Sequence, residues 1–133
     1  MTVFVDSSAL YAVLDADDVR HDAAADTLRG LVAAHEALVT NNYVVVETAA
    51  LAQHRLGRNG VRTLLQDLVA ALEVVWVDEG THASCVAALL AAPGARISLV
   101  DYTCFDVMRQ RHVERAFAFD RDFARAGFQL VPS

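Results

Sequence analysis

Short apolar segments that end in an acidic residue recur along this chain of 133 residues. Residues 3–5 precede Asp6, and residues 117–119 precede Asp120. Apolar runs this short are typical of buried strands, and the longer stretches between them have the composition of helices. Strands that alternate with helices favour a largely parallel sheet with both faces covered. The pattern therefore predicts an α/β fold.

The sequence predicts an αβα sandwich built on a mostly parallel sheet of about five short strands flanked by helices. We expect one domain over residues 1–133, since this length suits a single core. The expected strands are 2–5, 37–40, 73–77, 116–119 and 128–131. The first expected helix ends near Leu14. The other expected helices span about 19–34, 43–56, 61–71, 80–91, 99–112 and 121–126.

Several local features define the ends of these elements. Ser7 or Ser8 is expected to cap the first helix. The acids at 15–18 are expected to form a turn and to cap the second helix. The triple valine at 44–46 favours a strand by propensity. The residues after it favour a helix, which we expect to be apolar on most sides and buried, with a turn at 57–60.

Composition narrows the possible functions. A hydrophobic fraction of 55% argues against disorder, and no apolar run approaches the roughly 20 residues of a membrane span. Asp6 interrupts any N-terminal signal segment, so we expect a cytoplasmic protein. A net charge of −6 repels nucleic acid at long range, although cations in an acidic pocket reverse the local field. The chain contains arginine but no lysine. The absence of lysine excludes a P-loop and Schiff-base chemistry, because both require a lysine side chain.

The two cysteines and five histidines do not form a metal-binding pattern. Cys85 and Cys104 are far apart, and no histidine lies three or four residues from another. Free core thiols are the expected role of the cysteines.

Each acidic residue has an ordinary structural explanation when taken alone. Asp6 can cap a helix or close a turn. Glu47 can form a salt bridge or lie at a rim. Asp101 follows Ser98 at the spacing of a capping box, in which the acid reaches back to the cap. Asp120 can cap the short helix after it, and that helix can carry Asp122 as a first-turn acid.

Taken together, the acids have no common capping explanation. Asp6, Glu47, Asp101 and Asp120 are separated by whole strand–helix units, and such positions gather at the carboxyl edge of a parallel sheet. Carboxylates that close raise one another's pKa values unless a cation is present. Mg²⁺ and Mn²⁺ accept oxygen ligands and retain waters, and such waters are nucleophiles near neutral pH. The sequence therefore predicts a metal site.

Four segments resemble the motifs of the PIN-domain ribonucleases, and in particular the VapC-type toxins of toxin–antitoxin pairs. They are Val5-Asp6-Ser7-Ser8-Ala9-Leu10, Tyr43-Val44-Val45-Val46-Glu47, Ser98-Leu99-Val100-Asp101-Tyr102 and Phe117-Ala118-Phe119-Asp120-Arg121-Asp122-Phe123. Each motif is short, but their order, spacing and number are specific, and the resemblance covers essentially the whole chain.

The resemblance implies a metal-dependent endoribonuclease. By it, Asp6, Glu47, Asp101 and Asp120 bind Mg²⁺ or Mn²⁺ and carry catalysis, Asp122 assists a second ion, and Ser8 and Ser98 orient carboxylates or water. The implied reaction is hydrolysis of RNA phosphodiester bonds. The implied partners are a cognate antitoxin and a second copy of the chain in a homodimer. The apolar first helix, with Leu10, Tyr11, Val13 and Leu14, is expected to contribute to the antitoxin groove or to pack in the core.

RNA binding requires positive side chains, and two groups of arginines are candidates. They are Arg55, Arg58 and Arg62 near the central turn, and Arg109, Arg111, Arg115, Arg121 and Arg125 near the C-terminus. Solvated helix faces are the alternative explanation for each of them.

Other functions remain open at this point. An aspartate-nucleophile phosphatase or a phosphorelay receiver also places an acid after a strand, but both rely on a lysine. A PIN domain without catalytic activity could bind RNA or protein only. An RNA-processing nuclease without an antitoxin would share the chemistry.

Overall fold

The sheet is five-stranded and entirely parallel. A computed structural model describes residues 1–94 and 96–133. The strand order is β3-β2-β1-β4-β5, and every neighbouring pair runs in the same direction. The strands are β1 (Thr2–Val5), β2 (Ala37–Asn41), β3 (Glu73–Val75), β4 (Arg115–Phe117) and β5 (Gln129–Val131). The predicted five-stranded α/β architecture is confirmed.

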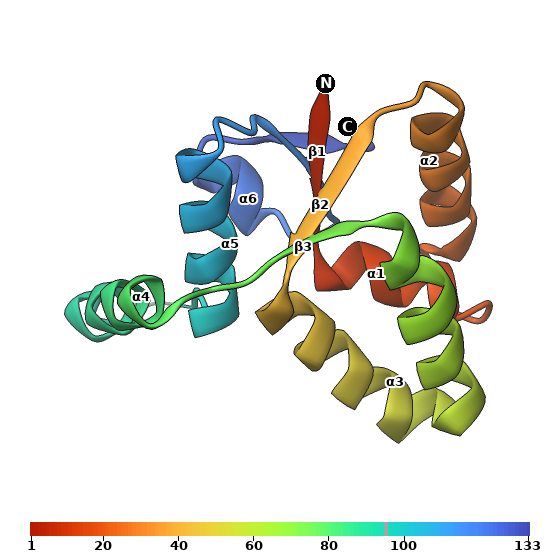
Figure 1. Ribbon diagram of the computed structural model, residues 1–133, viewed down its shortest axis with the longest axis horizontal. Helices are drawn as coiled ribbons and strands as arrows, with labels where there is room; N and C mark the ends of the chain where they lie inside the picture. Colours follow the sequence, from red (N-terminus) through yellow and green to blue (C-terminus); the bar gives the residue numbers. More distant parts are fainter. Residues whose placement is uncertain (95) are drawn as a thin grey trace.

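Helices flank this sheet on both sides. They are α1 (Ser7–Leu14), α2 (His21–Ala33), α3 (Asn42–Arg62), α4 (Glu79–Ala91), α5 (Leu99–Gln110) and α6 (Asp122–Arg125), with the π-helix η1 (Thr63–Leu68) and the 3₁₀ helix η2 (Val69–Ala71) after α3. In Figure 1, α1 and α2 lie on one side of the strands, and α5 and α6 lie on the other. Within the part of the chain that is described, no helix combines the length and apolarity needed to span a membrane.

The strand order changes direction once, beside β1. The chain first adds β2 and β3 on one side of β1, and then returns through α4 and α5 to add β4 and β5 on the other side. Ligands of open parallel sheets bind at such a switch point, beyond the carboxyl ends of the strands. Asp6 directly follows β1, and Asp120 lies just after β4.

The core is formed by the central strands and the helices that carry the acidic residues. Val3, Phe4 and Val5 of β1 are almost completely buried. Phe105 of α5 packs edge-to-face against Phe123 of α6, with ring centroids 5.1 Å apart. Because this contact joins α5 to α6, it fixes the two helices that carry Asp101 and Asp122 relative to each other.

Both cysteines lie in the interior, as the sequence predicts. Cys85 and Cys104 are buried free thiols.

The structure corrects two helix starts. Asp6, and not Ser7 or Ser8, caps α1, because its carboxylate accepts a hydrogen bond from the Ser8 amide. The acids at 15–18 do not cap α2, which begins at His21. Asp15 and Asp18 instead accept hydrogen bonds from the amides of residues 17 and 20, so their side chains are used within the turn.

Helix α3 confirms the choice of helix for the valine segment but corrects its burial. Val44, Thr48 and Ala52 form its buried stripe, whereas Val46 is 68% exposed. The predicted turn at 57–60 is a kink at Gly57, where φ is +73° and ψ is −165°, and helical structure resumes after it. The segment beyond it, predicted as helix 61–71, completes α3 and continues into η1 and η2.

Two glycines give a test of this backbone geometry. Ala at Gly57 should lower the free energy of unfolding by about 1–3 kcal/mol, because only glycine adopts that backbone region without strain. Ala at Gly30, inside α2 and with open space around its Cα, should instead raise stability by about 0.5–1 kcal/mol. Urea unfolding of both variants measures the difference. Equal effects of the two substitutions would contradict the kink.

Candidate metal centre

Asp6 is the most buried of the acidic side chains, with 3% of its surface exposed. Its Oδ2 accepts hydrogen bonds from the Ser8 amide (3.2 Å) and the Ser8 hydroxyl (2.7 Å). Its Oδ1 is buried and has no hydrogen-bond partner among the residues described. Burial raises the pKa of Asp6 to about 6, the charge of Asp101 adds to this, and the bonds from Ser8 oppose it. A buried carboxylate oxygen without a partner is rare and calls for a ligand.

Ser8 connects the ends of the two strands at the switch point. Its hydroxyl donates to Asp6 and accepts a hydrogen bond from the Phe119 amide at 3.0 Å. The Asp6 amide in turn donates to the Phe117 carbonyl at 3.0 Å. These bonds hold the residue after β1 against the residues after β4, and so fix Asp6 beside the segment that carries Asp120.

Glu47 approaches the same site from α3. It is an exposed residue, and the Ser7 hydroxyl donates a hydrogen bond of 2.6 Å to its Oε1. The bond joins the first turn of α1 to α3. Helix α3 is itself placed by its cap, because the Asn41 side chain accepts from the Val44 amide at 2.9 Å. Asn41 also donates to the Thr103 hydroxyl at 3.2 Å, which links the start of α3 to α5.

Asp101 is both a capping residue and a member of the acidic group. It forms a capping box with Ser98 at the start of α5, in which the Asp101 amide donates to the Ser98 hydroxyl at 3.1 Å. The Ser98 amide donates to the Asp101 carboxylate at 3.4 Å. Burial and, to a smaller extent, the charges of Asp120 and Glu47 together raise the pKa of Asp101 to about 6 against the bonds from Ser98, so the carboxyl is destabilised in its ionised form.

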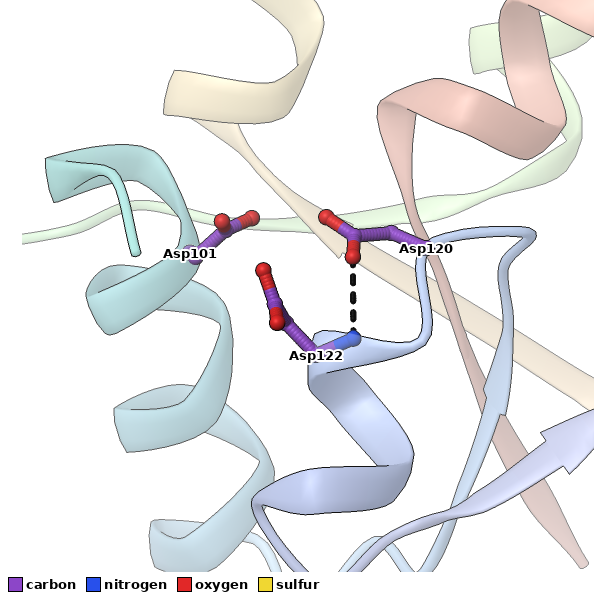
Figure 2. A group of neighbouring side chains, drawn as sticks. All are labelled: Asp101, Asp120 and Asp122. Atoms are coloured by element: carbon purple, nitrogen blue, oxygen red, sulfur yellow. Dashed lines mark hydrogen bonds between the residues drawn. The ribbon is translucent and has the colours of Figure 1, made fainter. Parts of the chain in front are cut away.

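Asp101, Asp120 and Asp122 converge from two elements. One carboxylate oxygen of each lies within 4.8 Å of the others, and Figure 2 shows the three carboxylates turned toward one another. The Asp122 amide donates to Asp120 Oδ1 at 2.9 Å, so Asp120 closes the turn before α6. This bond replaces the helix cap expected of Asp120, because Arg121 occupies the cap position of α6. Asp122 is a first-turn acid of α6, as expected.

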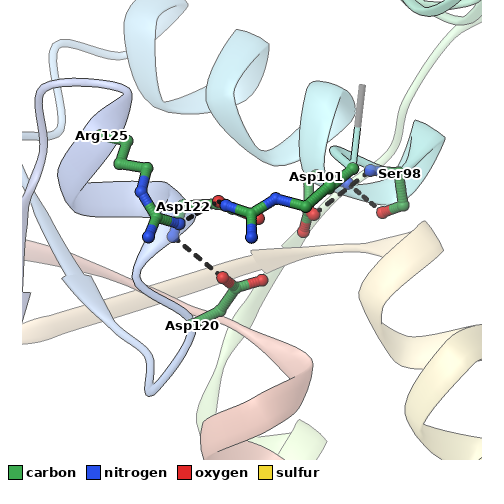
Figure 3. A network of polar contacts seen from close by, with 6 residues as sticks. Ser98, Asp101, Asp120, Asp122 and Arg125 are labelled. Carbon is green, nitrogen blue, oxygen red and sulfur yellow. Dashed lines mark hydrogen bonds and ion pairs between the residues drawn. The ribbon is translucent and has the colours of Figure 1, made fainter. Parts of the chain in front are cut away.

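Two arginines also contact Asp122. Arg125 donates to Asp122 Oδ1 at 2.8 Å, and Arg96 lies 3.7 Å from the same oxygen. Figure 3 shows this ion-pair network beside the Ser98–Asp101 capping box. Asp122 thus shares its charge between the acidic group and two cations.

The four principal acids line one cavity of about 280 Å³ at the carboxyl edge of the sheet. Its lining residues are Asp6, Ser7, Ser8, Tyr11, Asp18, Arg20, Glu47, Leu51, Ser98, Asp101 and Asp120. Asp122 adjoins it through Asp101 and Asp120. The predicted residues therefore lie around one cavity. The Ser8 hydroxyl and the Ser98 amide each donate to a carboxylate there.

These donors fit a hard divalent cation. Every acidic donor offers carboxylate oxygen, which Mg²⁺ and Mn²⁺ prefer over nitrogen or sulfur. Oδ1 of Asp6 has no hydrogen-bond partner among the residues described, and burial together with neighbouring charges raises the pKa values of Asp6 and Asp101, so a bound cation would stabilise both carboxylates in their ionised form. Asp101, Asp120 and Asp122 lie close enough together to share an ion, and Asp6 and Glu47 line the same cavity.

The sequence did not indicate a role at the site for three polar residues that line the cavity, Ser7, Asp18 and Arg20. Ser7 bonds Glu47, and Asp18 and Arg20 reach the cavity from the loop before α2. The sequence of the loop before α2 does not indicate a place at the site, because the loop is brought there by the packing of α1 against α2.

Other predicted contacts have structural roles. Leu10 and Tyr11 of α1 are buried, and Val13 and Leu14 pack against the core, so core packing accounts for this helix. Of the candidate RNA-binding arginines, Arg111 pairs with Glu73, Arg115 with Glu36 and Arg125 with Asp122.

Comparison with known proteins agrees with this geometry. The PIN domain family profile matches residues 3–129. The 23S rRNA-specific endonuclease VapC20 of Mycobacterium tuberculosis, in strains H37Rv and CDC 1551, is 34% identical over 131 residues, which cover 97% of each chain.

Two crystal structures share the fold. That of Mycobacterium tuberculosis VapC20, described as a sarcin-ricin loop cleaving toxin, superposes with a TM-score of 0.82 at 31% identity over 95% of each chain. PAE2754 of Pyrobaculum aerophilum has a TM-score of 0.65 at 17% identity, covering 99% of this chain and 90% of that one, and supports the fold alone. The chain is a full-length homologue of a VapC-type endonuclease toxin. With the acidic cavity at the switch point of its parallel sheet, this chain belongs to the PIN domain family.

Proposed function

We propose that this protein is an endoribonuclease that uses Mg²⁺ or Mn²⁺ to hydrolyse phosphodiester bonds in cytoplasmic RNA, as the toxin of a toxin–antitoxin pair. The observation that carries the proposal is the convergence of Asp6, Glu47, Asp101 and Asp120 on one cavity. The similarity to VapC20 over nearly the whole of both chains supports the same activity.

In this proposal the four carboxylates hold one ion, and Asp122 assists a second. When bound, the ion would activate water and neutralise the charge that develops on the phosphoryl oxygens. Ser8 fixes the Asp6 carboxylate, and Ser98 fixes the Asp101 carboxylate through the capping box. Because local hydrogen bonds hold both acids at the wall of the cavity, they need no large rearrangement to present oxygens to it.

The charge of the cavity explains why the activity would depend on a cation. Four carboxylates repel an RNA phosphate, and they also repel one another. A divalent ion offsets both effects. Arg96 and Arg125 already balance Asp122, so the uncompensated charge lies mainly on the four acids that line the cavity.

We further propose that the protein forms a homodimer and binds a cognate antitoxin, by analogy with VapC-type toxins. Glu47 lines a second, largely apolar groove of about 310 Å³ with Asn42, Tyr43, Val46 and Val100. A partner at this groove would lie directly beside the acidic cavity.

Asp101→Asn should reduce RNA cleavage by more than about a hundredfold, because it removes a charged ligand and weakens the capping box. Asp106→Asn is the matched control, since Asp106 lies on the same helix and, within residues 1–94 and 96–133, its side chain bonds only Gln110, at 2.8 Å. Purified variants are incubated with ribosomal RNA in Mg²⁺ or Mn²⁺, and new RNA ends are sequenced. The proposal would be contradicted if the wild type still cleaves RNA in EDTA, or if Asp101→Asn cleaves as well as the wild type. No cleavage by the wild type would favour an RNA- or protein-binding role.

Asp6→Asn should stabilise the protein when no divalent ion is present. The folded-state pKa of Asp6 is about 6, above its ordinary 3.8, so ionisation destabilises the fold as pH rises from about 4 to about 6. Asparagine keeps the helix cap but carries no charge. At pH 7.5 in EDTA we expect a gain of about 1–3 kcal/mol, which disappears near pH 4.

Adding Mg²⁺ or Mn²⁺ should make the wild type more stable than Asp6→Asn. An ion that binds only the folded state stabilises the wild type by about 2.7 kcal/mol at a hundred times its Kd, and Asp6→Asn should gain much less. Urea unfolding with and without the ion measures both effects. Asp26→Asn, an exposed acid on α2, serves as the control and should show neither. A variant less stable than wild type in EDTA at pH 7.5 would show that the Asp6 charge does not destabilise the fold.

A further inference from the structure

One basic side chain faces the acidic cavity. Among the residues that line the cavity in the described part of the chain, Arg20 is alone in carrying a positive charge. It lies in the loop before α2, whose position at the cavity follows from the packing of α2 on α1. A single cation at the wall of a cavity lined by five acids is placed where an anionic ligand would enter.

The Arg20 guanidinium is anchored by an aromatic ring. It lies over Phe119, 5.4 Å from the ring centroid. Phe119 directly precedes Asp120, and its amide donates to Ser8 at 3.0 Å, so the ring belongs to the same rigid segment as the acidic group. Stacking on an aromatic face restrains the guanidinium while its N–H donors, which lie in its own plane, stay available.

No carboxylate of the described residues neutralises the charge of Arg20. Arg20 takes part in none of the ion pairs found among residues 1–94 and 96–133, unlike Arg29, Arg96 and Arg125. Asp18, its neighbour at the cavity, uses Oδ1 to accept from the Arg20 amide at 2.8 Å. A restrained, exposed and unpaired guanidinium is ready to bind a phosphate through two parallel hydrogen bonds.

We propose that Arg20 binds a backbone phosphate of the RNA strand next to the bond that is hydrolysed, and so positions the strand across the acidic cavity. This inference rests on the proposed ribonuclease function and adds a substrate-binding residue to it. The contact would be independent of sequence, because it reads a phosphate and not a base. Arg20 would also offset the repulsion between the RNA backbone and the acids.

A purely structural role predicts different behaviour. Arg20 occupies the cap position of α2, but its side chain makes no capping hydrogen bond, and its carbonyl bonds the Ala24 amide at 2.9 Å whatever the side chain. Arg20→Ala should therefore fold normally and keep its affinity for Mg²⁺ or Mn²⁺. Arg29→Ala is the matched control, because it removes the same charge from an exposed arginine of α2 that pairs with Asp26.

The test measures binding of two phosphorothioate-linked single-stranded RNA oligonucleotides of different sequence by fluorescence anisotropy in Mg²⁺. Arg20→Ala should bind both about tenfold more weakly, and the slope of log affinity against log salt should fall by about 0.7. Arg29→Ala should stay within about twofold of wild type. Arg20→Lys should recover part of the affinity, since it keeps the charge but loses the stacking.

Steady-state cleavage gives a second readout, in which KM should rise about tenfold in Arg20→Ala while kcat changes by less than about threefold. Unchanged RNA affinity, an unchanged salt slope, or an equal loss in Arg29→Ala would overturn the proposal. If the wild type cleaves RNA and Arg20→Ala cleaves it equally well, only this inference about Arg20 would be overturned. A wild type that neither cleaves nor binds RNA would overturn the ribonuclease function as well.

Discussion

The cost of burying Asp6 and part of Asp101 next to other carboxylates is the constraint on which the rest of this structure depends. Asp6 is almost fully buried, and one of its oxygens has no hydrogen-bond partner in the described part of the chain. The charges of Asp120 and Glu47 add to the effect of burial on Asp101. The fold offsets this cost with apolar burial in the central strands and with serine hydroxyls that hold two of the acids in place. Such a destabilised arrangement is typical of functional sites, where stability is lost in favour of binding.

The same bonds serve the fold and the site. The capping box at α5 both starts a helix and orients Asp101, and the Asp6 carboxylate both caps α1 and faces the cavity. Capping and ligand roles are therefore not alternatives here, because a helix N-terminus orients the acidic side chain that begins it. The positive end of the helix also favours a negative side chain at that position.

Much of the fold could be predicted from the sequence because its strands are short apolar runs and its acids mark their ends. That residues 44–46 form a helix could be predicted only from the residues that follow them. Their burial was overestimated, since Val46 is exposed to solvent. The kink at Gly57 was predicted as a turn, because a glycine indicates a break but does not say whether a helix resumes beyond it.

The sequence by itself determined which residue types the site has, since oxygen-donating acids at the ends of strands and the starts of helices are local features of the chain. Only the tertiary structure decided which groups face one another. The reversal of strand order beside β1 brings Asp6 next to Asp120, and the packing of α2 on α1 places Arg20 over Phe119. These contacts join residues about a hundred positions apart, so no local pattern encodes them, and they follow from the way the helices pack on a twisted parallel sheet.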